Sequence, residues 1–109
     1  DASAAEAVLA DMEAAAVAPN VVTLNSLLHI YAARKDERGA RGVLRRMEAT
    51  GVAPNVQSFN TLVKACRDAS AAEAVMADME AAGVSPDVVT LNALMDKYAA
   101  RQDERGARG

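Results

Sequence analysis

The apolar residues of the chain recur at helical spacing in two kinds of segment. In the first kind, apolar side chains fall at i, i+3, i+4 and i+7 from about Thr23 to Arg34, which is one stripe of an amphipathic helix. The second kind carries a similar stripe between residues 40 and 47. The stripes lie at Leu24, Leu27, Leu28 and Tyr31; Phe59, Leu62, Val63 and Cys66; Leu91, Leu94, Met95 and Tyr98; Ala40, Val43, Leu44 and Met47; and Ala72, Val75, Met76 and Met79. The alternation predicts an all-α fold made of helix pairs.

Local signals mark where the second kind of helix starts and stops. Gly51 and Gly83 follow two of these helices and are expected C-caps. Ser70 precedes Glu73 by three residues, which is the spacing of a capping box at a helix start. The same pair recurs as Ser3 and Glu6.

The chain repeats itself. A shift of 67 residues lays "DASAAEAV" at 1–8 on the same letters at 68–75, and Pro19, Pro54 and Pro86 divide the 67 into 35 and 32. A period in this range indicates a solenoid of helix-turn-helix units. The three missing residues fall near 32–35, so the first helix of the shorter unit should be about one turn shorter. We expect a slice of a longer array with four parts. These are the second helix and exit loop of an incomplete leading repeat at 1–20, a full 35-residue repeat at 21–55, a shortened 32-residue repeat at 56–87, and an incomplete trailing repeat at 88–109 with a first helix and the start of a second.

One complete unit, "VVTLNSLLHIYAARKDERGARGVLRRMEATGVAPN" at 21–55, resembles the pentatricopeptide repeat. The matching features are the "VVTLN" start, the small-residue turn, the "VLRRMEATG" helix and the Pro exit, and the resemblance extends over about three units. Tetratricopeptide repeats are the nearest alternative, but the chain lacks their Trp, Gly, Tyr and Pro marks. The resemblance implies an α-solenoid that winds into a right-handed superhelix.

The resemblance also implies a function, because the family binds single-stranded RNA at one base per repeat. The fifth and last residues of a repeat select the base, which here pairs Asn25 with Asn55 and Asn60 with Asp87. The family code implies a pyrimidine, C over U, for the first pair and U for the second, so the slice would read 5′-pyrimidine-U-3′. Asn20 and Asn92 would belong to the two incomplete repeats, and together these positions account for all five Asn of the chain.

The residue types suit this chemistry. An amide offers donors and an acceptor and can address the mixed edge of a pyrimidine, whereas a carboxylate only accepts and suits the N3–H of uracil. In the family, the second residue of each repeat is an aliphatic wedge against the base, and Val22 and Val89 fit that role, whereas Gln57 does not. The family's Lys near the end of the first helix, for the phosphate, is replaced by Ala33 and Ala100.

The net charge of the chain argues against RNA binding, whereas the distribution of the charges supports it. Nucleic-acid binders gain affinity from phosphate neutralisation, and the chain has a formal net charge of −3. Many acids lie on the second helices, whereas the first helices, which line the concave surface in this family, carry cations that we take as possible phosphate contacts. These are Arg34, Lys35, Lys64, Arg67, Lys97 and Arg101, whose alternative interpretation is ordinary solvated helix charge.

Other interpretations of single residues remain open. Asn20 and Asn55 follow Pro residues and are candidate N-caps. His29 aligns with Lys64 and Asp96 and should face solvent. Cys66 replaces a Tyr of the other units and is expected in the core, where it leaves no internal disulfide. The recurring Met12, Met47 and Met79 are likewise expected to be core.

No motif for an enzyme, a cofactor or a metal site occurs, and no apolar run approaches the roughly 20 residues that span a bilayer. The resemblance implies a mitochondrial or chloroplast protein in RNA processing, stability or translation. The alternative function is a scaffold subunit that packs against other proteins of an organellar complex such as a ribosome.

Overall fold

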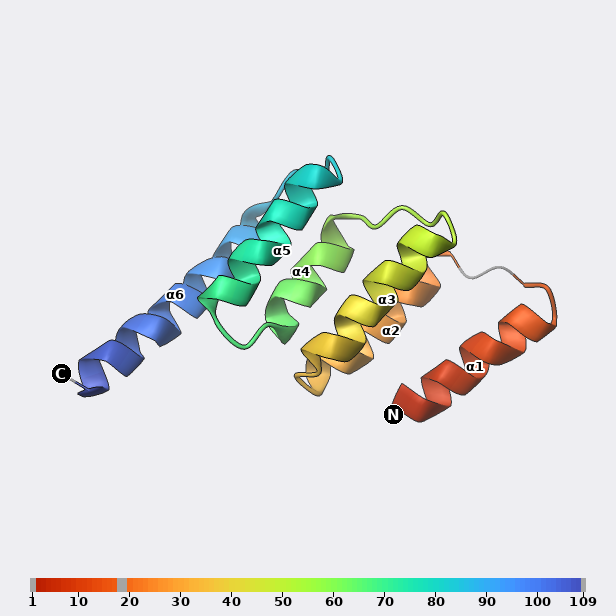
Figure 1. The fold of residues 1–109 in the computed structure, drawn as a ribbon, viewed down its shortest axis with the longest axis horizontal. Coiled ribbons are helices and arrows are strands. Elements are labelled where there is room, and N and C mark those ends of the chain that lie inside the picture. Colours follow the sequence, from red (N-terminus) through yellow and green to blue (C-terminus); the bar gives the residue numbers. More distant parts are fainter. Residues whose placement is uncertain (1, 18–19, 109) are drawn as a thin grey trace.

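The computed structural model describes residues 2–17 and 20–108, in which the chain forms helices joined by short turns and loops, with no strand in these ranges. Figure 1 shows the helices side by side along an elongated body, with α1 at one end and α6 at the other. The body measures 57 × 30 × 19 Å. The helices are α1 (Ala2–Ala14), α2 (Val21–Ala33), α3 (Glu37–Ala49), α4 (Val56–Ala65), α5 (Ala69–Ala81) and α6 (Val88–Arg108).

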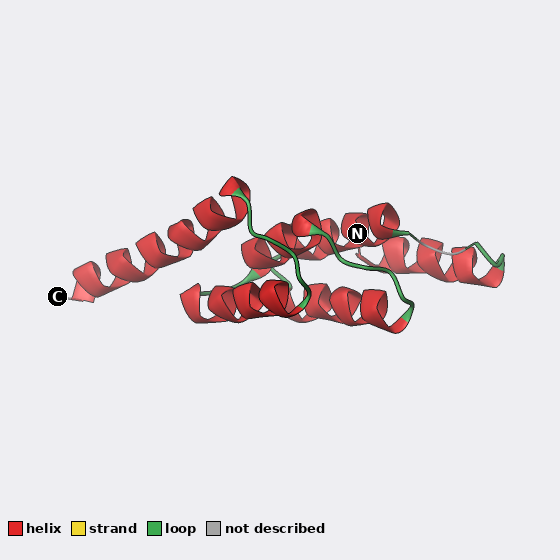
Figure 2. Ribbon diagram, turned by 90° about the horizontal axis from the view of Figure 1, so that it is seen from above, coloured by secondary structure: helices red, strands yellow, loops and turns green. Residues whose placement is uncertain are grey.

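The helices form two layers. In Figure 2, α3 and α5 lie in one row, and α2, α4 and α6 lie in the other. Helix α2 packs against α3 and α4, and α4 in turn packs against α5 and α6. Each unit therefore covers the apolar face of the next, which is the arrangement of an α-solenoid and confirms the predicted fold class.

The core lies between the layers. The predicted stripes of α2 and α4 are buried, with Leu24, Leu28, Phe59 and Leu62 at 0 to 1% exposure. Cys66 is also buried, as expected. On α6 the stripe is more open, with Leu91 46%, Met95 65% and Tyr98 38% exposed. The reason is that α6 packs only against α4 and α5, whereas α4 also contacts α2 and α3.

The first helices begin two residues earlier than predicted. Asn20 and Asn55 are the N-caps of α2 and α4, and their side chains accept hydrogen bonds from the backbone N–H groups of Thr23 and Ser58. This satisfies amides that have no partner inside the helix. The N-cap interpretation of these two Asn is therefore confirmed.

The predicted capping box of α5 is wrong. Its N-cap is Asp68, whose carboxylate accepts from the Ala71 N–H. Ser70 lies inside the helix, two positions after the cap, so its hydroxyl cannot take that role. Ser3 has the same place in α1, which begins at Ala2. A carboxylate directly before the helix caps it and also favours the positive end of the helix dipole.

The helix ends follow the prediction. Gly51 and Gly83 adopt positive φ after α3 and α5, and the N–H of the following Val bonds back to the fifth-preceding carbonyl. This is the Schellman arrangement that favours Gly. Helix α4 has 10 residues against 13 in α2, as the three-residue deletion predicts.

The trailing segment differs from the expectation. Helix α6 continues without a break to Arg108, whereas the corresponding chain in the first full repeat turns at residues 34–36 before α3. That turn places Lys35 at a φ of 57° and is stabilised by the buried face of α3 at Ala40, Val43, Leu44 and Met47.

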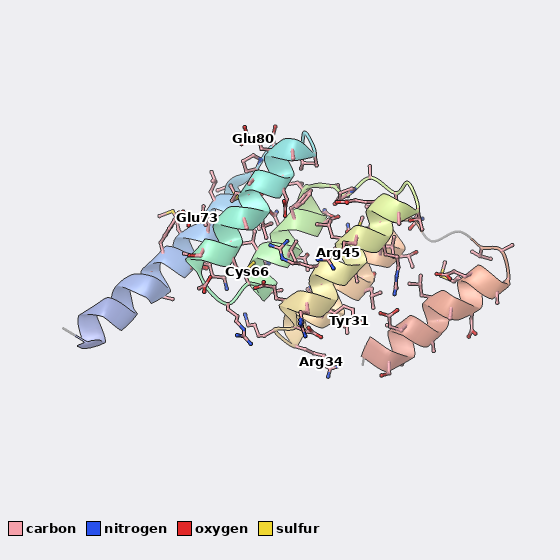
Figure 3. The ribbon with its side chains drawn as sticks, viewed as in Figure 1. Tyr31, Arg34, Arg45, Cys66, Glu73 and Glu80 are labelled. Carbon is pink, nitrogen blue, oxygen red and sulfur yellow. The ribbon has the colours of Figure 1, made fainter. Side chains whose placement is uncertain are left out.

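Ion pairs join the second helices. Helices α1 and α5 carry acids, and Figure 3 shows two of them, Glu73 and Glu80, along α5. Helix α3 instead carries four Arg, of which Arg45 is labelled in Figure 3. Arg46 binds Glu6 of α1 at 2.8 Å, and Arg41 binds Asp78 of α5 at 3.3 Å. The basic helix thus lies between two acidic neighbours and bonds to both.

Candidate nucleic-acid interface

One groove runs along the layer of first helices and holds every residue that was predicted to select or flank the two central bases. Its volume is about 740 Å³, and it is formed by α2, α4, the residue before α4 and the start of α6. His29 and Lys64 lie on its wall, and His29 is exposed as predicted. The predicted residues that line it are Asn25, Asn55, Asn60, Asp87, Val22, Gln57 and Val89.

The first predicted pair is joined by hydrogen bonds. Asn25 Nδ2 donates to Asn55 Oδ1 at 3.2 Å, and the same oxygen accepts from the Ser58 N–H at 3.1 Å. The Ser58 hydroxyl accepts from the Asn55 N–H at 3.1 Å and donates to Asn25 Oδ1 at 2.5 Å. The cap of α4 and the two amides therefore form one closed network.

The second pair has the same arrangement. Asn60 Nδ2 donates to Asp87 Oδ1 at 3.1 Å, and the Thr90 N–H donates to that oxygen at 3.0 Å. The Thr90 hydroxyl accepts from the Asp87 N–H at 3.1 Å and donates to Asn60 Oδ1. The bonds from the Thr90 N–H and the Asn60 amide lower the pKa of Asp87, which is therefore an ionised carboxylate at neutral pH.

The two networks leave different groups facing the groove. Asn60 is only 6% exposed, whereas Asp87 is exposed, so the carboxylate is the main group offered by the second pair, with Oδ2 as its outer acceptor. In the first pair, Asn55 Oδ1 already accepts two bonds, and its NH2 group carries two further donors. The first pair is thus richer in donors and the second in acceptors.

The predicted wedge residues lie on the open side of the groove. Val22 is 68% exposed and Val89 is 44% exposed, so both aliphatic side chains are accessible beside the polar networks. Gln57 lies between them and is also exposed. A planar ring that entered beside Asn25 would therefore lie between Val22 and Gln57, and one beside Asp87 would lie between Gln57 and Val89.

Three predicted cations gather next to the groove. Lys35, Lys64 and Lys97 line one hollow together with Asn92 and a single acid, Asp96, and Lys64 belongs to the groove as well. Lys35 Nζ donates to the Lys64 carbonyl at 3.2 Å, which holds the end of α2 against the end of α4. Although the chain is acidic overall, the layer of first helices carries a local positive cluster.

The other predicted residues lie outside these two hollows. Arg34 is exposed at the end of α2, near Tyr31 in Figure 3, and Arg67 is exposed in the turn after α4. Asn20 caps α2 away from both pairs. The side chain of Arg101 lies outside the described residues.

Sequence reasoning missed Ser58 and Thr90, which bond to both members of each pair. The available signal was the hydroxyl that occurs two residues before Asn25, Asn60 and Asn92, as Thr23, Ser58 and Thr90. Because these residues also stand near helix starts, the pattern does not distinguish them from ordinary caps.

Other kinds of site lack support within the residues described. No group of three or more His, Cys, Asp or Glu side chains there is placed to hold a metal ion. None of the helices in this part of the chain combines the length and apolarity that crossing a bilayer requires. Burial raises the pKa of Cys66 to about 11, so its thiol is protonated and a poor nucleophile at neutral pH.

The fold and the groove define an α-helical repeat protein with a polar interface on one layer. The family described as "Pentatricopeptide repeat domain" matches residues 7–69 and 67–101, and the chain belongs to this family. A similar solved structure is the pentatricopeptide repeat domain of Arabidopsis thaliana protein-only RNase P 1 in complex with tRNA. It is 25% identical with a TM-score of 0.77, and the match covers 95% of this chain and 55% of that one. No curated protein matches the sequence.

Proposed function

We propose that the chain binds single-stranded RNA in the groove between Val22 and Val89, with one base at each hydrogen-bonded pair. The observation that carries the proposal is that a single groove contains both pairs and all three flanking side chains. The tRNA complex of the similar domain supports RNA as the ligand class. Proteins of this family are typically organellar, and we propose mitochondria or chloroplasts as the location.

The groups left at each pair favour different pyrimidines. The Asp87 carboxylate accepts from a ring N–H, which uracil has at N3 and cytosine lacks. The Asn55 NH2 group donates and therefore suits the N3 and O2 acceptors of cytosine. We propose a 5′-pyrimidine-U-3′ preference, with C favoured over U at the first pair.

Affinity should be low and salt-dependent. Two base sites contribute a few kcal/mol, and a millimolar Kd already needs about 4 kcal/mol. The cluster of Lys35, Lys64 and Lys97 supplies the phosphate attraction, which weakens as salt rises. The suitable measurement is therefore a nuclear magnetic resonance titration at millimolar RNA, in which amide shifts identify the residues that respond.

The test compares the hexaribonucleotides 5′-AACUAA-3′ and 5′-AACGAA-3′ with the natural chain and with Asn60→Thr. The natural chain should bind the first more tightly, and the variant should shift its preference toward G, as the family code implies. A good base contact discriminates by about 1 to 3 kcal/mol, so the preference should change by about fivefold or more. Asn92→Thr is the matched control: it is the same substitution at the fifth position of another repeat, and Asn92 belongs to neither of the two pairs.

Three outcomes are informative. An unchanged preference in Asn60→Thr means that Asn60 is a structural amide and overturns its role in selection. Equal binding of pyrimidine and purine strands at both pairs overturns the proposed preference. An absence of shifts in the groove with any strand at millimolar concentration overturns RNA binding and favours the scaffold function.

A further inference from the structure

We infer that Ser58 and Thr90 are positioning residues for base selection: each hydroxyl sets the direction of the amide in the preceding repeat and thereby decides which groups a base meets. The inference rests on the proposed RNA binding and adds a third residue to each base site. That residue comes from the third position of the following repeat.

The direction of the Asn25 amide follows from a chain of fixed donors. The Ser58 backbone N–H can only donate, so the atom of Asn55 that faces it at 3.1 Å must be the side-chain oxygen. That oxygen also faces the Asn25 amide at 3.2 Å, so Asn25 must present its NH2 group there. The Asn25 oxygen is then directed at the Ser58 hydroxyl, which supplies the proton it needs.

The hydroxyl can donate in this direction because its acceptor side is already occupied. The Asn55 N–H donates to Ser58 Oγ at 3.1 Å. A hydroxyl carries one proton, and Asn25 Oδ1 at 2.5 Å is nearer to Ser58 Oγ than Asn55 Oδ1 at 3.1 Å, so Ser58 donates to Asn25 Oδ1. Ser58 thus connects the cap of α4 to the amide of α2 and opposes a reversed amide.

Thr90 repeats the logic with a carboxylate in place of the second amide. Both oxygens of Asp87 accept, so the Asn60 group that faces Oδ1 must be NH2, and the Asn60 oxygen must face the Thr90 hydroxyl. With Asn60 held in this way at 6% exposure, the outer part of the Asp87 carboxylate is left for a base. The recurrence of one network with different residues argues against an accidental contact.

Capping alone does not account for the arrangement. Thr23 occupies the same position before α2, where its hydroxyl bonds to the side chain of the cap Asn20 at 3.1 Å. Among the described residues it has no bond to a fifth-position amide. Thr23 therefore has the capping role without the positioning role and provides a matched control.

The experiment titrates the natural chain, Ser58→Ala, Ser58→Thr and Thr23→Ala with 5′-AACUAA-3′ and with 5′-AAAUAA-3′. These strands differ only at the base expected beside Asn25 and Asn55. Shifts of the Gln57 backbone and of the Asn25 side-chain amide report this site, and those of Val89 report the second site in the same sample. Thermal unfolding of each variant measures the loss of the cap separately.

We expect Ser58→Ala to lower the preference for C over A at the first site by about fivefold, with the second site unchanged. Ser58→Thr should restore the preference because it retains the hydroxyl. Thr23→Ala should lose a similar amount of thermal stability without any change of preference. A Ser58→Ala chain that keeps its preference, or a Thr23→Ala chain that loses as much, would overturn the inference.

Failure of the inference differs from failure of the proposed function. If the natural chain binds neither strand, RNA binding itself is wrong. If the natural chain prefers C and Ser58→Ala prefers it equally, RNA binding stands and Ser58 is only a cap. Thr90→Ala, titrated with 5′-AACUAA-3′ and 5′-AACAAA-3′, repeats the test at the second site, where the preference for U over A should fall.

Discussion

The end of α1 offers a quantitative test of the repeat's backbone. Ala16 has a φ of 61°, in the left-handed region, at the position where the other repeats have Gly51 at 77° and Gly83 at 73°. The Val17 N–H bonds to the Met12 carbonyl at 2.7 Å, which shows that Ala16 completes the same turn without glycine. A left-handed residue with a Cβ costs about 1 to 2 kcal/mol.

Ala16→Gly should therefore stabilise the end of α1. Glycine removes this strain, but it also lowers stability by about 0.5 to 1 kcal/mol because the unfolded chain has more conformational freedom to lose. The expected net gain is about 0.5 to 1 kcal/mol. Because helices at the end of a solenoid open locally, this predicts about a two- to fivefold slower amide exchange in α1.

Two further variants check the reasoning. Gly51→Ala places a Cβ with no atom within 4 Å, so any loss of stability comes from the backbone alone, again about 0.5 to 1 kcal/mol. Ala82→Gly makes the same chemical change at a φ of −84° and should destabilise α5 instead. Faster exchange in α1 of Ala16→Gly, or a Gly51→Ala chain as stable as the natural one in urea, would refute the argument.

Two other predictions concern Tyr31. A Cβ at Gly39 would clash with the Tyr31 ring. Gly39→Ala should therefore lower stability in urea, because the clash costs about 1 to 3 kcal/mol and the better helix propensity of Ala offsets only about 1 kcal/mol. In a Tyr31→Cys background the same substitution should stabilise, and a loss of equal size there would contradict the packing explanation. Hydrogen bonds from Tyr31 and Arg46 lower the pKa of Glu6, so its contribution is present above pH of about 4.3 and lost as pH falls through the lower folded value. Glu6→Gln should therefore lower the Tm at pH 7, which corresponds to a loss of at most about 1 kcal/mol in the free energy of unfolding, and the loss should shrink below pH of about 4. A loss of the same size at every pH would show that the charge of Glu6 is not the cause.

Helix type and order could be predicted because the apolar stripes repeat. Leu24, Leu28, Phe59 and Leu62 are buried as the spacing indicated. The start of α5 could not be predicted from Ser70, because two nearby side chains were able to cap and only the folded turn shows that Asp68 is the one in range. Competing local signals of similar strength are decided by the path of the chain.

The candidate site was predictable to a similar degree. Repeat alignment located the amides and Asp87, but it could not show that each amide bonds to the last residue of its own repeat. Nor could it show that Ser58 and Thr90 connect them, because a sequence separation of about 30 residues carries no local signal. Contacts between repeats appear only when the helices stack.

The physical unit of the chain is the 67-residue pair rather than one repeat. Tyr31 bonds to Glu6 and Tyr98 bonds to Glu73, each across 25 positions. The matching positions in the repeat between them hold Cys66 and Arg41, and Arg41 bonds to Asp78 instead. Two kinds of junction therefore alternate along the array.

This alternation restricts how the repeats can stack. Arg46 of α3 pairs with Glu6 of α1, and Arg41 of α3 pairs with Asp78 of α5, whereas two acidic second helices packed directly on each other would bring acids together. Like charges at that distance repel, whereas the native register pairs opposite charges at both faces of α3. The two ion pairs of α3 therefore connect the second helices of three consecutive units, and since both pairs are partly exposed, each adds at most about 1 kcal/mol.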